Sequence, residues 1–241
     1  MNITYPAGDS GMILVFDGLI SENVCKQFTD EVSSIWNDVS FQGKTLGGVD
    51  IKIKNSFDMA FSEMGFTERN MTYPVVFKNM ESIFLNGFIQ AIAAYQNKYR
   101  ALHSWIEVED TGFQVQCYNK CMGWYREHVD SFPGTEAQNR VLSGIIYLND
   151  VEQGGQTRFP LHDVEVEARA GRIVLFPSNF THPHEGKTPL SNDKWILNTF
   201  FVLNEQPNQM NSNEHHEHDG HEHDHLGNHL PKMQLVPQEE K

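Results

Sequence analysis

The second half of the chain limits the possible folds most, because short strand-like segments follow one another there with turns between them. The turns are marked by Pro133-Gly134, Gly154-Gly155 and Ala170-Gly171. The strand-like segments are residues 112–118, 123–128, 141–148, 157–159, 163–167, 172–176 and 195–203. Many short strands at this spacing are typical of a β-sandwich or jelly roll.

The first hundred residues have mostly helical patterning. Residues 12–16 form an apolar run that predicts a first strand, and Ser21 is a suitable N-cap for a helix that follows it. Apolar residues recur at helical spacing after Ser21 and again over residues 75–100, where one long helix or two in succession are expected. Residues 39–72 show no clear pattern. The chain is therefore predicted to be an α+β protein, a β-sandwich supported by N-terminal helices.

Composition divides the chain into three parts. Residues 1–105 provide the N-terminal strand and the supporting helices, and residues 106–204 provide the β-rich core. Residues 205–241 are polar and contain seven of the twelve histidines, interleaved with acidic residues. A segment of this composition cannot bury a core, so we expect a His-rich disordered tail. Its role is open between metal handling and a solvated low-complexity segment.

Charge and cysteine content narrow the function classes. The net charge of -14 makes nucleic acid a poor partner, since an acidic surface repels phosphate. No apolar run is long enough to span a membrane, and no signal peptide is recognisable at the N-terminus. Three cysteines without such a signal favour reduced thiols and a cytoplasmic location. Cys117 and Cys121 would supply only half of a structural zinc site, and no second pair exists.

A possible metal site begins at His128 and Asp130. The two residues lie two apart in a strand-like run, so their side chains point to the same face and can reach one ion. One imidazole and one carboxylate are two-thirds of the two-His-one-carboxylate triad of non-haem iron(II) enzymes. A salt-bridged surface pair is the alternative, because a lone H-x-D is common. The third ligand must come from a distant strand, and His182 and His184 are the candidates.

The spacing of several motifs resembles that of the prolyl-4-hydroxylase-type 2-oxoglutarate/iron(II) dioxygenases. The family pattern is roughly Y…Y-x-x-H-x-D, YLN, GG-x-T-x-F, G-x-x-x-x-F, and then a histidine and a basic residue. The matching residues here are Tyr118, Tyr125, His128, Asp130, Tyr147-Leu148-Asn149, Gly154 to Phe159, Gly171 to Phe176 and Lys194. The resemblance covers about residues 112–203 and, more weakly, residues 12–36. It implies a double-stranded β-helix, which agrees with the jelly roll predicted from strand spacing.

The resemblance also implies roles for individual residues. His128, Asp130 and one downstream histidine would bind iron, and Lys194 would pair with the C5 carboxylate of 2-oxoglutarate. Tyr147 matches the tyrosine that assists there, and Tyr118 matches one that lines the co-substrate pocket. Ordinary sheet core is the alternative for both. In such hydroxylases the third ligand lies eight residues after the strand-ending phenylalanine, and the basic residue follows nine or ten later. Both intervals favour His184 over His182. Lys194 stands where many members have arginine.

The activity implied is oxidation of a substrate by dioxygen, coupled to conversion of 2-oxoglutarate to succinate and carbon dioxide. Fe(II) is the implied cofactor, 2-oxoglutarate the co-substrate, and L-ascorbate a possible helper that keeps iron reduced. Peptidyl proline is the favoured substrate of such an enzyme, with other peptides, proteins and small molecules left open. The alternative is a non-catalytic jelly-roll protein that binds a metal or another ligand. Loss of Asp130 or Lys194 would have favoured it, and both are present.

Overall fold

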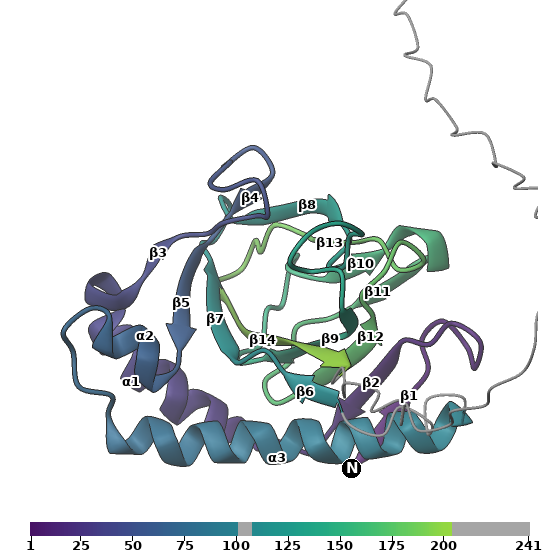
Figure 1. Cartoon of the computed structure of the whole chain (residues 1–241), viewed down its shortest axis with the longest axis horizontal. Coiled ribbons are helices and arrows are strands. Elements are labelled where there is room, and N and C mark those ends of the chain that lie inside the picture. Colours follow the sequence, from purple (N-terminus) through teal and green to yellow (C-terminus); the bar gives the residue numbers. More distant parts are fainter. Residues whose placement is uncertain (101–107, 204–241) are drawn as a thin grey trace, which may run out of the picture. The chain divides into compact units, whose positions relative to one another are not determined.

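Strands β7 to β14 are divided between two antiparallel sheets that face each other (Figure 1). The computed structural model describes residues 1–100 and 108–203, and the following bounds refer to these residues. The sheet that packs on the helices contains β1 (Asn2–Thr4), β2 (Leu14–Asp17), β3 (Phe41–Gln42), β5 (Phe57–Phe61), β6 (Val108–Asp110), β7 (Phe113–Tyr118), β9 (Arg140–Tyr147), β12 (Ile173–Pro177) and β14 (Lys194–Leu203). The other sheet contains β4 (Lys54–Asn55), β8 (Trp124–His128), β10 (Thr157–Phe159), β11 (Val164–Val166) and β13 (His184–Gly186).

The strand order is that of a jelly roll. The first sheet runs β1-β2-β12-β9-β14-β7-β5-β3, with β6 paired to β14. The second runs β11-β10-β13-β8-β4. Strands β7 to β14 thus form the double-stranded β-helix that the sequence predicted. The N-terminal strands extend both sheets, so residues before and after position 105 share the same hydrogen-bonded layers. The predicted tail over residues 205–241 lies outside the described residues.

Two cores explain why strands of the first sheet are apolar on both faces. In β12, Ile173 and Leu175 point to the helices, whereas Val174 and Phe176 point to the second sheet. Successive side chains of a strand face opposite sides, so burial of both sides requires a continuous apolar run. The same alternation in β2 puts Leu14 and Phe16 on the helix side and Val15 between the sheets.

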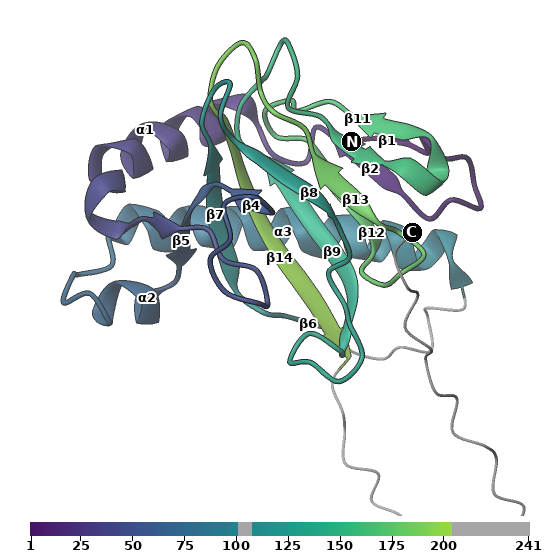
Figure 2. The same cartoon turned by 90° about the horizontal axis from the view of Figure 1, so that it is seen from above.

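Two long helices cover the outer face of the first sheet (Figure 2). Helix α1 (Glu22–Val39) begins at the predicted N-cap, where the Val24 N–H donates to the Ser21 hydroxyl at 3.3 Å. Helix α3 (Val75–Lys98) is a single helix of 24 residues. A short helix, α2 (Glu63–Thr67), lies in the region that sequence patterning left unassigned, as do β3 to β5. No described helix combines the length and apolarity needed to cross a membrane.

Candidate metal centre and co-substrate pocket

The metal-ligand candidates meet where β8 and β13 pair. His184 is the cross-strand partner of His128, and Asp130 lies just beyond the end of β8. The Nε2 atoms of His128 and His184 lie 3.4 Å from Oδ1 and Oδ2 of Asp130, respectively. One ligand atom from each residue lies within 4.8 Å of the others, and within the described ranges no other His, Cys, Asp or Glu group meets this condition. The three residues therefore form a compact set of donors for one ion.

Backbone hydrogen bonds fix which ring nitrogen each histidine offers. Nδ1 of His128 lies 2.8 Å from the carbonyl oxygen of Arg126, and Nδ1 of His184 lies 3.2 Å from that of His182. A ring nitrogen facing a carbonyl carries the proton and donates, which leaves Nε2 as a lone-pair donor. Metal-binding histidines are commonly oriented in this way. Both Nε2 atoms are thus prepared to bind a metal.

Aromatic packing holds the two imidazoles in place. The Tyr125 ring stacks on His128 with a centroid distance of 3.5 Å, and Phe176 meets His184 edge-on at 4.7 Å. Burial lowers the pKa of His184 to about 4, an effect that Asp130 opposes. His184 is therefore neutral at physiological pH, which is the form that binds metals.

Asp130 is held in its ionised form. Its Oδ2 accepts a 2.6 Å hydrogen bond from Ser143, whose hydroxyl also contacts that of Ser178 at 2.8 Å. Burial acts to raise the pKa of Asp130, but His184, His128 and the Ser143 hydroxyl hold it well below its usual range. The side chains of His128 and Asp130 are only 15% and 11% exposed. The two side chains are therefore largely buried and do not form a pair on the exposed surface.

His182 lies in a turn before β13 and takes no part in this cluster. Its Nε2 contacts the carbonyl oxygen of Gly11 at 2.8 Å, and its Nδ1 contacts the Thr181 hydroxyl at 2.8 Å. Its ring stacks on His162. The structure thus brings His184, and not His182, next to His128 and Asp130.

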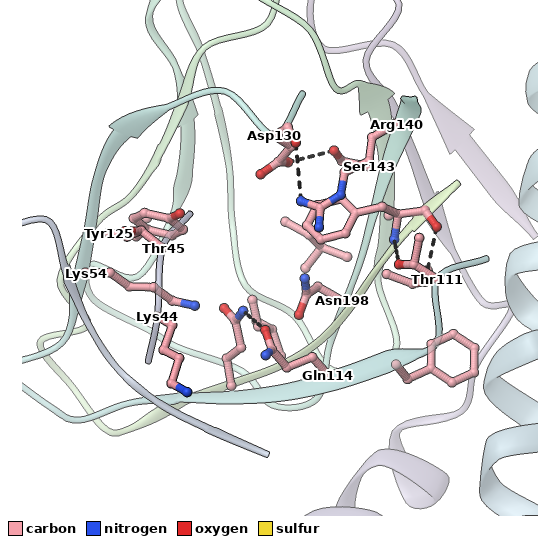
Figure 3. Close-up of a pocket in the computed structure, with 18 of the residues that line it drawn as sticks. Lys44, Thr45, Lys54, Thr111, Gln114, Tyr125, Asp130, Arg140, Ser143 and Asn198 are labelled. Carbon is pink, nitrogen blue, oxygen red and sulfur yellow. Dashed lines mark hydrogen bonds between the residues drawn. The ribbon is translucent and has the colours of Figure 1, made fainter. Parts of the chain in front are cut away.

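The cluster opens into a cavity of about 510 Å³ between the two sheets (Figure 3). Lys194, at the start of β14, lines this cavity and is 2% exposed. Its ammonium group lies over the rings of Tyr118 and Tyr147, at 5.5 and 5.4 Å from their centroids. It has no carboxylate or hydrogen-bond partner within residues 1–100 and 108–203. Burial lowers the pKa of Lys194 to about 7, so an anion in the cavity would stabilise its charged form.

The two predicted tyrosines differ in their access to the cavity. Tyr118 lines it, and its hydroxyl donates to Oε1 of Gln116 at 2.6 Å. Tyr147 is fully buried beneath Lys194, and its hydroxyl donates to Thr157 at 2.7 Å. Burial raises the pKa of both phenols, which therefore stay protonated. Both tyrosines border Lys194, but only Tyr118 forms part of the cavity wall.

Two other cations that could replace Lys194, Arg140 and Arg172, have partners already. Arg172 forms a two-point ion pair with Asp17, at 2.8 and 3.1 Å. The guanidinium of Arg140 lies 3.7 Å from the Phe200 ring centroid and donates to the Asp130 carbonyl. These arrangements leave Lys194 as the buried cavity-lining cation without an anionic or hydrogen-bonded partner in the described part of the chain.

A buried ion pair beside the cavity was not predictable from local sequence patterns. Lys54 and Asp58 are 2% and 0% exposed, and their charged atoms lie 2.7 Å apart. Ser56 donates to the second carboxylate oxygen of Asp58 at 2.7 Å. Lys54 also lies over the Tyr125 ring, 5.1 Å from its centroid. The pair joins β4 to β5, and thus one sheet to the other, beside the aromatic ring that supports His128.

Residues 113–202 match the family model described as "2OG-Fe(II) oxygenase superfamily". This part of the chain is therefore similar to the 2OG-Fe(II) oxygenases. It includes the whole donor cluster and Lys194 and begins at the first strand of the double-stranded β-helix. A "Putative prolyl 4-hydroxylase" of Acanthamoeba polyphaga mimivirus is 25% identical over 209 residues, which cover 78% of this chain and 72% of the relative.

Solved prolyl hydroxylases share the fold of the oxygenase domain and its N-terminal support. A viral collagen prolyl hydroxylase from Paramecium Bursaria Chlorella virus-1 superposes with a TM-score of 0.58 at 15% identity, covering 81% of this chain and 97% of that one. A prolyl hydroxylase from Trichoplax adhaerens gives 0.62 at 16% identity, with 81% and 85% covered. A Pseudomonas putida prolyl-4-hydroxylase gives 0.58 at 18% identity, with 82% and 97% covered. The chain thus has the fold of these prolyl hydroxylases.

Proposed function

We propose that this protein hydroxylates peptidyl proline, using Fe(II) and 2-oxoglutarate and releasing succinate and carbon dioxide. In this proposal His128, Asp130 and His184 hold the iron. Residues 106–204 form the catalytic core, residues 1–105 support it, and residues 205–241 form a tail that is not needed for turnover. L-ascorbate serves as a reductant that maintains Fe(II), and the protein acts in the cytoplasm.

The observation that carries the proposal is the unpaired Lys194 ammonium in the same cavity as the donor cluster. Burying a charge without a partner is costly, so its retention needs a compensating anion. A dicarboxylate that reaches the metal with one end and Lys194 with the other provides that anion. Tyr118 and Tyr147 border the ammonium and form the rest of this carboxylate site. The iron supplies the oxidising chemistry, while the protein orients the reactants and excludes water.

The choice of peptidyl proline as substrate rests on similarity. The relatives and structural neighbours are named as prolyl hydroxylases, and the Trichoplax adhaerens structure holds a hypoxia-inducible-factor peptide fragment. A small-molecule substrate is the competing possibility within the same chemistry. No nucleic-acid or membrane partner is expected from the acidic charge and the absence of an apolar spanning segment.

The test is to incubate the full-length protein with Fe(II), 2-oxoglutarate, ascorbate and a library of proline-containing peptides. We expect succinate to form and one or more peptides to gain an oxygen atom on proline, both detectable by mass spectrometry. Anaerobic binding of 2-oxoglutarate to the Fe(II)-loaded protein is measured in parallel. Binding without succinate would favour the non-catalytic jelly-roll alternative, and absence of both would refute the proposal.

A further inference from the structure

Lys194 lies at a strand end, where one of its two neighbouring strands stops short of it. It is the first residue of β14, and its cross-strand partner on one side is Tyr118 of β7. On the other side β14 pairs with β9, but β9 ends at Tyr147, the partner of Ile196 (Figure 2). A strand end that is paired on one side only frays easily. The backbone at Lys194 therefore needs another partner on the β9 side.

The side chain of Asn149 provides that partner. Its Oδ1 accepts from the Trp195 N–H at 2.7 Å, and its Nδ2 donates to the Asp193 carbonyl at 2.9 Å. In an extended strand the carbonyl before a residue and the N–H after it point to the same side, so one carboxamide can bind both. Asn149 thus holds the main chain directly before and directly after Lys194, in place of the main-chain groups that a longer β9 would offer.

This support matters because the Lys194 side chain is unfavourably placed in the ligand-free protein. Lys194 is 2% exposed, and its ammonium has no anionic partner within residues 1–100 and 108–203. A buried charge without a counter-ion favours any movement that returns it to water. The preceding residue, Asp193, is exposed, so a shift of this short segment would bring the ammonium toward solvent. The two hydrogen bonds of Asn149 oppose that shift.

We propose that Asn149 is a positioning residue for co-substrate binding, which fixes the backbone around Lys194 so that the ammonium stays in the cavity and meets the distal carboxylate of 2-oxoglutarate. Asn149 is not part of the cavity wall, so it acts through Lys194. This inference rests on the proposed function, in which Lys194 binds that carboxylate. Its consequence is selective, since loss of Asn149 should weaken binding of the distal carboxylate and leave binding through the keto-acid end unchanged.

The test compares 2-oxoglutarate with 2-oxopentanoate, which has a methyl group in place of the distal carboxylate. Binding of each to the full-length, Fe(II)-loaded protein is measured by anaerobic calorimetry. For Asn149→Ala we expect the dissociation constant of 2-oxoglutarate to rise roughly 5- to 50-fold, since up to two hydrogen bonds are lost, and that of 2-oxopentanoate to stay unchanged. Asn192→Ala is the matched control. Asn192 also donates to the Asp193 carbonyl, at 3.1 Å, but its removal leaves both bonds of Asn149 in place, so the wild-type ratio of the two constants should persist.

A double-mutant cycle with Lys194→Met distinguishes positioning from a general loss of stability. If Asn149 acts through Lys194, Asn149→Ala should weaken 2-oxoglutarate binding in the wild-type background but not in the Lys194→Met background. Equal weakening of both keto acids, no weakening of either, or the full effect in the Lys194→Met background would overturn the inference and leave the proposed function standing. If wild type does not bind 2-oxoglutarate, the proposed function and this inference are both refuted.

A second variant keeps the test decisive if Asn149→Ala does not fold. Asn149→Asp retains an acceptor for the Trp195 N–H but cannot donate to the Asp193 carbonyl. It should therefore show the same selective loss of 2-oxoglutarate binding. An unchanged ratio of the two dissociation constants in Asn149→Asp would overturn the inference as well.

Discussion

Replacing Lys194 with methionine should weaken 2-oxoglutarate binding and, at the same time, stabilise the ligand-free protein. Methionine fills similar space without a charge. A charge-assisted contact contributes about 1.5–3 kcal/mol, so the dissociation constant for 2-oxoglutarate should rise roughly 10- to 150-fold. The ligand-free protein no longer has to bury an ammonium group whose pKa is lowered to about 7. A shift of that size from the ordinary lysine value corresponds to a cost on the order of a few kcal/mol.

The pH dependence gives this prediction a sign. Because the pKa of Lys194 is lower in the folded than in the unfolded protein, the unfolded state binds more protons between about pH 7 and the ordinary lysine value. Wild-type stability should therefore rise with pH across that window. The stability gained by Lys194→Met is complete below pH 7 and disappears as pH approaches the ordinary value. Binding of 2-oxoglutarate to wild type above pH 7 should take up a proton, and binding to the variant should not.

Thermal unfolding between pH 6 and pH 10 and calorimetric titration with 2-oxoglutarate in buffers of different ionisation enthalpy measure these effects. Lys26→Met is a suitable control, since Lys26 lies on the exposed face of α1 with 73% of its side chain accessible. The reasoning is refuted if Lys194→Met binds 2-oxoglutarate as tightly as wild type and melts at the same temperature. In that case another cavity cation, Arg140, carries the co-substrate contact.

Three further predictions concern the donor cluster, the cavity wall and the tail. His184→Ala should abolish tight Fe(II) binding and turnover, whereas His182→Ala should keep both. His182→Ala should lose about 0.5–1.5 kcal/mol of stability, because it removes the hydrogen bond to Gly11. The opposite result in metal titrations would exchange the roles of the two histidines. Asp58→Asn leaves the buried Lys54 without its counter-ion, so it should lower the free energy of unfolding by about 3–5 kcal/mol in urea denaturation. A loss below about 1 kcal/mol would show that water solvates the pair. Truncation after Asn204 should preserve turnover at saturating Fe(II). It should also remove the weak additional metal binding of the full-length protein, which decreases below about pH 6.5 as the histidines are protonated and can be followed by elemental analysis of the dialysed protein. A folded but inactive truncated protein would place the tail in the active site.

Much of the fold was predictable because the strands of the jelly roll are local patterns. The seven strand-like segments correspond to β7, β8, β9, β10, β11, β12 and β14, and the predicted helices correspond to α1 and α3. β13 was missed because only three residues form it, directly after the turn that contains His182 and Pro183. β4 was missed because it is two residues long and buries a lysine, contrary to the usual exposure of charge.

The site was predictable only where its residues are close in sequence or match a family spacing. His128 and Asp130 are two apart, and Lys194 follows His184 at the interval that the family resemblance implies. The family spacing favoured His184 over His182, but no local pattern reveals the contact of His182 with Gly11, 171 residues away. The same holds for Asn149, whose hydrogen bonds on either side of Lys194 become visible only when β14 lies beside β9.

The charges of the proposed complex explain why the cation and the donor cluster belong to one cavity. Fe(II) contributes two positive charges, Asp130 one negative, Lys194 one positive and 2-oxoglutarate two negative, so the full set is neutral. Charges in a water-poor cavity interact strongly, and an uncompensated one is costly. Metal and co-substrate should therefore bind cooperatively, each lowering the cost of burying the other, and this coupling must be equal in both directions. A neutral His184 is essential to the balance, because a protonated imidazole there would repel the metal and leave the cavity with excess positive charge.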